Sequence, residues 1–158
     1  MTFKNKKLTF TILTLIWMCV IFSFSLQTGE TSSEISGSLI EKLITLFMSD
    51  AQIAPEQISF LEHVLRKCAH FLEFLVLGVL SSITMEYWKF KYKVLCGFFF
   101  CINVAVVDEI LQLFISGRSG SVKDVMIDSA GAVVGIVILF PILQKLLLLR
   151  IIKRSVIF

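Results

Sequence analysis

Charged residues are scarce in this sequence, and their scarcity argues against an ordinary soluble domain. Only 17% of the 158 residues are charged, whereas 56% are hydrophobic, and the mean hydropathy is +0.87. An average soluble domain carries about 25% charged residues. The formal net charge of +3 is too small to argue for a nucleic-acid partner. The composition therefore predicts a membrane protein.

Cysteine motifs and strand patterns are lacking as well. The four cysteines form no CxxC pair and have no histidine at zinc-site spacing, so we interpret them as small packing residues. A membrane barrel would need segments of about ten residues that alternate in polarity, and runs such as VLCGFFFCINVAVV show no such alternation. No internal repeat or low-complexity segment is present. Helices are therefore the expected spanning element.

Long apolar runs with few breakers predict four transmembrane helices, each with the ~20 residues that ~30 Å of hydrocarbon requires. We predict one all-α membrane domain over residues 1–158, with spans at about residues 8–26, 67–87, 94–115 and 125–148.

The first span also fits a cleavable signal peptide, because its basic start precedes an apolar stretch and the small residues Ser23 and Ser25. Against cleavage, Phe22, Phe24 and Leu26 extend the apolar run past that point.

Lysine and arginine concentrate before the first span, between the second and third spans, and after the fourth. The positive-inside rule places these segments and both termini in the cytoplasm, and the loops at residues 27–66 and 116–124 outside.

The loop at residues 27–66 is too long for a bare connector. Its sequence Thr31-Ser-Ser-Glu34 fits a capping box, and Pro55 marks a fresh helix start that leads into the second span. After the box, apolar residues recur at helical spacing. They predict an extracytoplasmic amphipathic helix, either in the headgroup layer or over the bundle as a lid: Ile35, Leu39, Ile40, Leu43, Ile44 and Phe47.

Ionisable residues in the spans are candidates for function, because a charge near the bilayer centre costs about 2.5–3.5 kcal/mol on insertion scales. Helical periodicity groups them on one flank of the second span, one face of the third and one side of the fourth. On the fourth span they share that side with Gly131 and Gly135, which allow close helix approach. We expect all of them, with one loop arginine, to meet in the outer leaflet: Lys67, His70, Glu73, Asp108, Glu109, Gln112, Arg118, Asp124 and Asp128.

Crowded carboxylates in this layer must pair, hold protons or bind a cation. We expect Asp108 or Glu109 to be the shared-proton or cation-binding position, because these two lie deepest. His70 with Asp124 or Asp128 also fits a hard-metal site, but no motif identifies a metal or another cofactor. Simpler interpretations remain: Arg66 and Lys67 fit snorkelling anchors, Glu73 fits an internal ion pair, and the charges together fit a scaffold that only holds helices together.

The segments KCAHFLEFLVLGVL and DEILQLFISGRSGSVKDVMIDSAGAVVG resemble the VanZ-like family, named after an accessory protein of teicoplanin resistance. The family pattern is K-x-x-H-F-x-E, then D-E-x-x-Q, then G-R and D-x-x-x-N/D-x-x-G, and it covers about residues 66–135. The resemblance implies a multi-pass protein of the bacterial cytoplasmic membrane, with the nine candidates above and Gly131 as motif positions. Three positions depart from the pattern. Phe74 stands where the family often has Tyr, Ser116 stands where Pro often precedes Gly-Arg, and Asp128 stands where many members have Asn.

The favoured function is a binding site that opens to the outer leaflet. It would hold the polar head of a lipid-linked envelope precursor, a phospholipid or a glycopeptide, and it would lower glycopeptide susceptibility. Arg118, with an anion nest formed by the turn at Gly117 and Gly120, would take phosphate. A hydrolase or transferase with His70 as general base is one alternative, although no GxSxG motif is present. The other alternative is a lipid or solute translocator, for which a homo-oligomer would supply the path.

Overall fold

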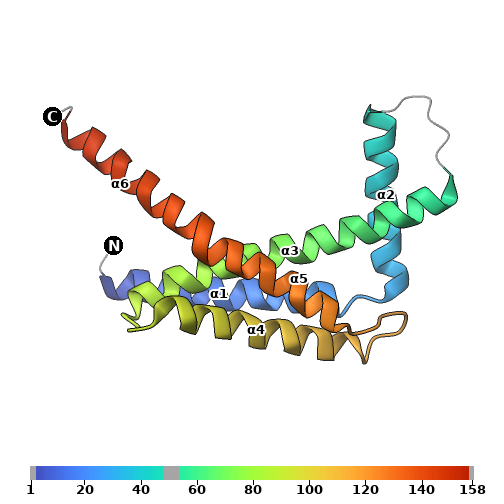
Figure 1. Ribbon diagram of the computed structural model, residues 1–158, viewed down its shortest axis with the longest axis horizontal. Coiled ribbons are helices and arrows are strands. Elements are labelled where there is room, and N and C mark those ends of the chain that lie inside the picture. Colours follow the sequence, from blue (N-terminus) through green and yellow to red (C-terminus); the bar gives the residue numbers. More distant parts are fainter. Residues whose placement is uncertain (1–2, 48–53, 157–158) are drawn as a thin grey trace.

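The structure is a computed structural model that describes residues 3–47 and 54–156, and these residues form helices joined by short turns (Figure 1). The predicted all-α class is therefore confirmed. In chain order the elements are α1 (Phe3–Ser25), α2 (Gly29–Phe47), α3 (Pro55–Tyr87), α4 (Lys93–Gln112), α5 (Val122–Val133), the π-helix η1 (Val134–Leu139) and α6 (Phe140–Val156).

Four helical stretches are long and apolar enough to cross a membrane, which confirms the predicted number of spans. The second predicted span is the C-terminal part of a longer helix, since α3 runs unbroken for 33 residues. Helix α3 can begin at Pro55 because the first residues of a helix donate no intrahelical hydrogen bond, so the missing N–H of proline costs nothing there. The four stretches are Lys4–Ser25, Pro55–Tyr87, Lys93–Gln112 and Val122–Leu149.

Helix α3 is the central element and contacts every other helical element. It crosses the helix formed by α5 and η1 (Figure 1). A Cβ atom on Gly131 would lie 2.2 Å from the carbonyl oxygen of Phe71, and one on Gly78 would lie 2.5 Å from that of Ala132. The predicted close approach of a helix at Gly131 is therefore confirmed. Beside this crossing lies the apolar core: Ile21, Phe74, Leu77, Cys101, Val104, Ala105, Ala132 and Ile136.

One end of the bundle joins the start of α1, the α3–α4 turn and α6. The Trp88 indole donates to Thr11 Oγ1 at 3.0 Å, and Lys7 Nζ lies 3.4 Å from the centre of the Trp88 ring. Gln144 donates to Glu86 Oε2 at 3.3 Å and so brings α6 to the same end. Lysines therefore gather at this basic end, and which membrane face it occupies stays a prediction. The side chains of Arg150, Lys153 and Arg154 lie outside the described part of the chain.

At the opposite end the α1–α2 turn packs on the α4–α5 loop. The Gly29 N–H donates to the Ser116 carbonyl at 3.0 Å. Gly117 has a φ of +74°, a conformation that favours glycine. A Cβ atom on Gly29 would lie only 2.1 Å from the Gly117 carbonyl oxygen. The two glycines thus let two backbones touch beside the polar residues.

Helix α2 lies across the first part of α3 (Figure 1). The capping box predicted at Thr31 is wrong: the helix begins at Gly29, and Thr28 Oγ1 accepts from the Thr31 N–H at 3.3 Å. Thr28 can do this because its hydroxyl reaches the N3 amide, as an N-cap residue does. Ile40 is buried, whereas Leu39 and Leu43 are half exposed. The helix is amphipathic as expected, its extracytoplasmic position remains a prediction, and the side chain of Phe47 lies outside the described residues.

Candidate functional site

The polar residues of three helices meet at the end opposite the basic end. Helix α3 supplies three of them, α4 three and α5 two, each spaced so that the side chains face the centre of the bundle. Arg118 joins them from the α4–α5 loop. The structure thus brings all nine candidates to one end: Lys67, His70, Glu73, Asp108, Glu109, Gln112, Arg118, Asp124 and Asp128.

Asp108 is fully buried, and one of its oxygens is held from two sides. Ser25 Oγ donates to Asp108 Oδ2 at 2.6 Å, and Gln112 Nε2 donates to the same oxygen at 3.1 Å. The other oxygen, Oδ1, has no hydrogen-bond partner among the described residues. Ser25 is a site residue that sequence reasoning missed. The only signal was its position at the end of the first span, on the side of the polar layer.

Glu109 is fully partnered. The Ser121 N–H donates to Glu109 Oε2 at 2.6 Å, and Gln112 Nε2 lies 3.4 Å from Oε1. Ser121 is also the N-cap of α5, where its hydroxyl accepts from the Lys123 N–H. Glu109 therefore ties α4 to the start of α5, and Asp108 is the one of the two with an unpartnered oxygen.

Lys67 forms an ion pair with Asp124 and joins α3 to α5. Both groups are mostly buried, with side chains 29% and 11% exposed. Lys67 extends across the helix crossing to this carboxylate. Its interpretation as a snorkelling anchor stays a prediction.

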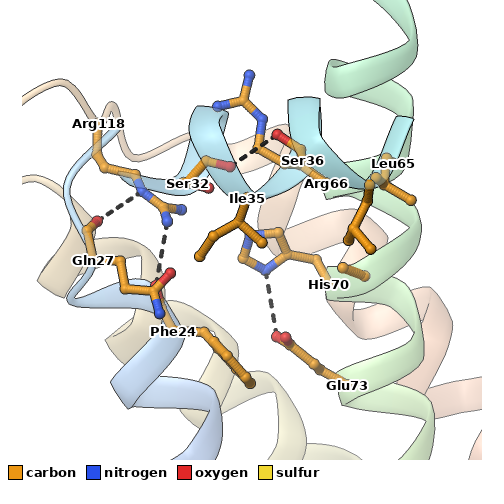
Figure 2. Close-up of a pocket in the computed structure, with 12 residues that line it drawn as sticks. Phe24, Gln27, Ser32, Ile35, Ser36, Leu65, Arg66, His70, Glu73 and Arg118 are labelled. Atoms are coloured by element: carbon orange, nitrogen blue, oxygen red, sulfur yellow. Dashed lines mark hydrogen bonds and ion pairs between the residues drawn. The ribbon is translucent and has the colours of Figure 1, made fainter. Parts of the chain in front are cut away.

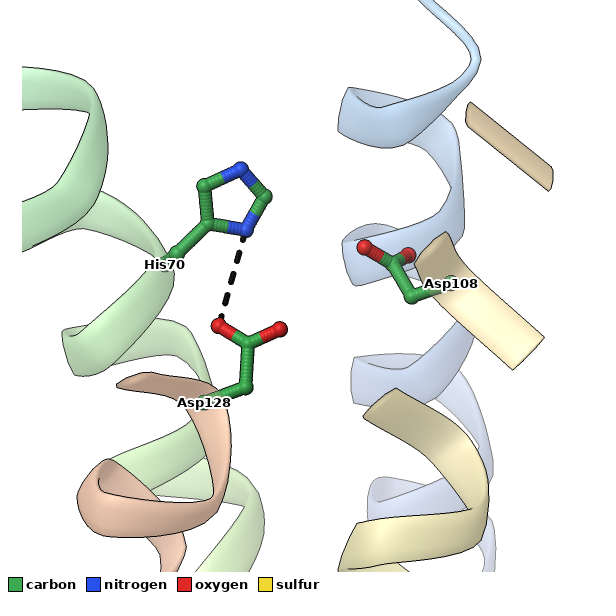
Figure 3. A group of neighbouring side chains, drawn as sticks. All are labelled: His70, Asp108 and Asp128. Atoms are coloured by element: carbon green, nitrogen blue, oxygen red, sulfur yellow. Dashed lines mark ion pairs between the residues drawn. The ribbon is translucent and has the colours of Figure 1, made fainter. Parts of the chain in front are cut away.

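His70 and Asp128 face each other without a hydrogen bond. His70 Nδ1 lies 3.8 Å from Asp128 Oδ1 and 4.0 Å from Glu73 Oε2, and both distances exceed hydrogen-bond length. Within the described part of the chain, His70 Nδ1 and both Asp128 oxygens have no hydrogen-bond partner. Figure 3 shows the Asp108 carboxylate pointing at them from α4. One ligand atom from each of His70, Asp108 and Asp128 lies within 4.8 Å of the others.

A pocket of about 220 Å³ opens beside His70, between α1, α2 and α3. In Figure 2 the side chains of Arg66 and Arg118 lie at one edge of the pocket and Glu73 at the other. Apolar side chains form most of the remaining wall, including Phe24, Ile35, Leu39 and Leu65.

Arg118 is held in place by backbone carbonyls. Its Nε donates to the Gln27 carbonyl at 3.1 Å, and its Nη2 donates to the Phe24 carbonyl at 3.2 Å. Burial lowers the pKa of its guanidinium below the ordinary value, and the positive charge of Arg66 lowers that pKa further. Among the described residues, no carboxylate lies within 4.0 Å of either guanidinium.

Two backbone amides beside the glycine turn donate inside the protein, so they take no part in the anion nest expected there, and a nest formed by the other amides of the turn stays a prediction. The Arg118 N–H donates to the Ile115 carbonyl at 3.1 Å, and the Ser121 N–H donates to Glu109. Both amides are used inside the protein because they close the α4–α5 loop. The positive charge that an anion would meet comes from the two arginine side chains.

Comparison with known proteins agrees with the sequence motifs. A family model described as VanZ/LLP1 matches residues 10–147 and so includes α1, with Ser25, as well as the motif helices. No significant match was found among curated proteins or solved structures. Because the family model covers most of the chain, this four-span protein with a buried polar cluster at one end belongs to the VanZ/LLP1 family.

Proposed function

We propose that this membrane protein binds the anionic head of a membrane amphiphile in the pocket between α1, α2 and α3. The observation that carries the proposal is the pair Arg66 and Arg118. Two guanidinium groups stand at one edge of an apolar-walled pocket, and neither has a carboxylate partner among the described residues. Guanidinium groups bind phosphate and carboxylate oxygens in paired hydrogen bonds, so a phosphate head fits this edge.

The pocket's size and lining favour a lipid head over a complete antibiotic. Its volume of about 220 Å³ is below the ~300–1,000 Å³ typical of pockets that enclose whole small molecules. Ile35 and Leu39 of α2 line the pocket and are about half exposed, so the apolar chain of an amphiphile has a surface to lie along. A phospholipid or a lipid-linked envelope precursor satisfies both requirements.

The distribution of Lys and Arg supports a pocket that faces the outer leaflet, where cell-wall precursors are presented. If the bound head belongs to such a precursor, holding it would lower glycopeptide susceptibility. Glu73 and His70, which also line the pocket, would then meet amines or sugar hydroxyls of the head group. A second copy of this chain remains a proposed partner.

The test compares phosphate-headed and neutral lipids on the purified protein. We expect native mass spectrometry to detect a polyprenyl phosphate bound in preference to a diacylglycerol. Arg66→Gln should weaken that binding about 10-fold or more, because a hydrogen bond to a charged group contributes about 1.5–3 kcal/mol. Arg66 is the cleaner position, since Arg118 also holds the α1–α2 turn.

Lys91→Gln is the matched control, because it removes a positive charge from an exposed position at the basic end. It should bind the polyprenyl phosphate like the wild type. Equal binding of the two lipids by the wild type, or unchanged binding by Arg66→Gln, would contradict the proposal.

A further inference from the structure

We propose that His70, Asp108 and Asp128 form a site for one divalent transition-metal cation such as Zn²⁺ or Mn²⁺. The inference does not rest on the proposed function, because the arginines of the pocket take no part in it. It starts from the buried carboxylates of the cluster, some of which have hydrogen-bond or ion-pair partners whereas others have none. Glu109 has the Ser121 amide and Asp124 has Lys67, but both Asp128 oxygens and Asp108 Oδ1 have no partner within the part of the chain that the structure describes.

Burying carboxylate oxygens without partners is unfavourable unless a cation or a proton neutralises them. Asp108 and Asp128 are 0% exposed, so water at the surface does not solvate their carboxylates. The nearby protein cations already have other positions: Lys67 pairs with Asp124, and Arg118 donates to backbone carbonyls. A dication would neutralise two carboxylates and use the His70 nitrogen as well.

The distances suit a metal. Zinc bonds to nitrogen and oxygen are about 2.0–2.2 Å long, so two ligand atoms of a tetrahedral ion lie roughly 3.4 Å apart. His70 Nδ1 and Asp128 Oδ1 are 3.8 Å apart, slightly beyond that spacing. The whole group of three ligand atoms lies within 4.8 Å, and small side-chain rotations would close the difference. Three protein ligands leave a position open for a water or a bound group.

Two neighbouring residues hold the Asp108 carboxylate in position. Ser25 and Gln112 both donate to Asp108 Oδ2, which fixes the carboxylate and leaves Oδ1 without a hydrogen-bond partner among the described residues. Figure 3 shows this carboxylate on the side of α4 that faces His70 and Asp128. Hydrogen bonds to ligating carboxylates are a regular part of metal sites and raise metal affinity. The donors come from α1 and α4, so the site draws on every transmembrane helix.

The ligand set indicates the kind of metal. Ca²⁺ and Mg²⁺ prefer oxygen ligands alone, whereas an imidazole nitrogen suits Zn²⁺ and other first-row transition metals. Mn²⁺ accepts carboxylates readily and is compatible with one nitrogen. We therefore expect Zn²⁺ or Mn²⁺ to bind more tightly than Mg²⁺ or Ca²⁺.

The experiment measures metal content and thermal stability of the chelator-treated protein in detergent. Titration with Zn²⁺ or Mn²⁺ should load one ion per chain and raise Tm, and Mg²⁺ or Ca²⁺ should do so only at higher concentration. Asp108→Asn, Asp128→Asn and His70→Gln should each weaken metal binding at least about tenfold. Without metal, Asp128→Asn should be at least as stable as the wild type, because it removes an unpaired buried charge.

Glu41→Gln is the control. It neutralises an exposed carboxylate of α2 that lies outside the group of ligand residues, so metal binding should be unchanged. The inference is overturned if neither Zn²⁺ nor Mn²⁺ loads or raises Tm, which would leave protons or water as the partners. It is also overturned if folded Asp128→Asn or His70→Gln protein binds the metal as tightly as the wild type.

Discussion

Two serines near the end of α1 differ in what their hydroxyl groups meet. Ser25 donates to a carboxylate oxygen of buried Asp108 at 2.6 Å, whereas exposed Ser23 donates to the Val20 carbonyl of its own helix at 2.7 Å. A buried carboxylate that loses a donor keeps its desolvation cost. At the scale of single residues, the environment of a hydroxyl therefore decides its contribution to stability.

Ser25→Ala should lower the free energy of unfolding by about 1–3 kcal/mol, because it leaves a buried acceptor short of a donor. Ser23→Ala should change it by less than about 0.5 kcal/mol, as an exposed substitution usually does. Denaturant unfolding of both variants in the same detergent measures the difference. Equal effects would show that the Ser25–Asp108 hydrogen bond does not stabilise the fold.

The sequence predicted nine of the residues that gather at the site, but it predicted neither Ser25 nor how the residues pair. Asp108 and Glu109 are adjacent in an apolar run, and the sequence around them does not tell them apart. The distinction comes from Ser25, 83 residues earlier, and from Ser121, 12 residues later. Partner choice of this kind depends on packing between helices, which helical periodicity does not encode.

At the scale of elements, the crossing of α3 with α5 positions the whole site. Lys67 and His70 face Asp124 and Asp128 only because the two backbones approach closely at Gly131. The spacing of Gly131 and Gly135 made this crossing predictable. The π-helix η1 was not predicted. It ends at Leu139, two residues before Pro141, whose ring would clash with the carbonyl of Val137 in a regular α-helix.

Gly131→Ala should destabilise the protein, because its Cβ would lie 2.2 Å from the Phe71 backbone oxygen and force α3 and α5 apart. Gly97→Ala is the matched control. Gly97 is also a buried helical glycine, but its Cβ would lie 3.4 Å from Ser81 Oγ, an ordinary contact. Helix propensity alone would then favour the Gly97→Ala variant by up to about 1 kcal/mol. Thermal unfolding should rank Gly97→Ala above Gly131→Ala, and the opposite order would contradict the crossing.

At the scale of the whole molecule, the two ends differ in chemistry. Lys7 and Trp88 mark the basic end, and the buried carboxylates lie at the other end. Helix α2 is at that other end (Figure 1). Helix α6 extends away from the bundle on the basic side. The four spans and their order were predictable from hydropathy, because each apolar run is long enough on its own. Hydropathy did not predict the contact between the α1–α2 turn and the α4–α5 loop, because that contact depends on the backbone geometry at Gly29 and Gly117.

We predict that the polar end faces outward. In a variant without its native cysteines, Glu41→Cys should react with a membrane-impermeant maleimide in intact cells, whereas Lys91→Cys should react only after permeabilisation. Both positions are exposed in the structure, so labelling reports their side of the membrane. The positive-inside rule is the physical basis. The reverse pattern would place the pocket in the cytoplasm.

The ion pair between Lys67 and Asp124 also bears on how the protein is made. Its partners are 57 residues apart, so at roughly 5–20 residues per second a ribosome adds Asp124 about 3–11 s after Lys67. During that interval α4 is still being added, and α5, which carries the partner of Lys67, follows only at its end. With 33 residues, α3 is longer than the ~20 needed to span a bilayer, so its first turns have room to remain in water until the later helices arrive.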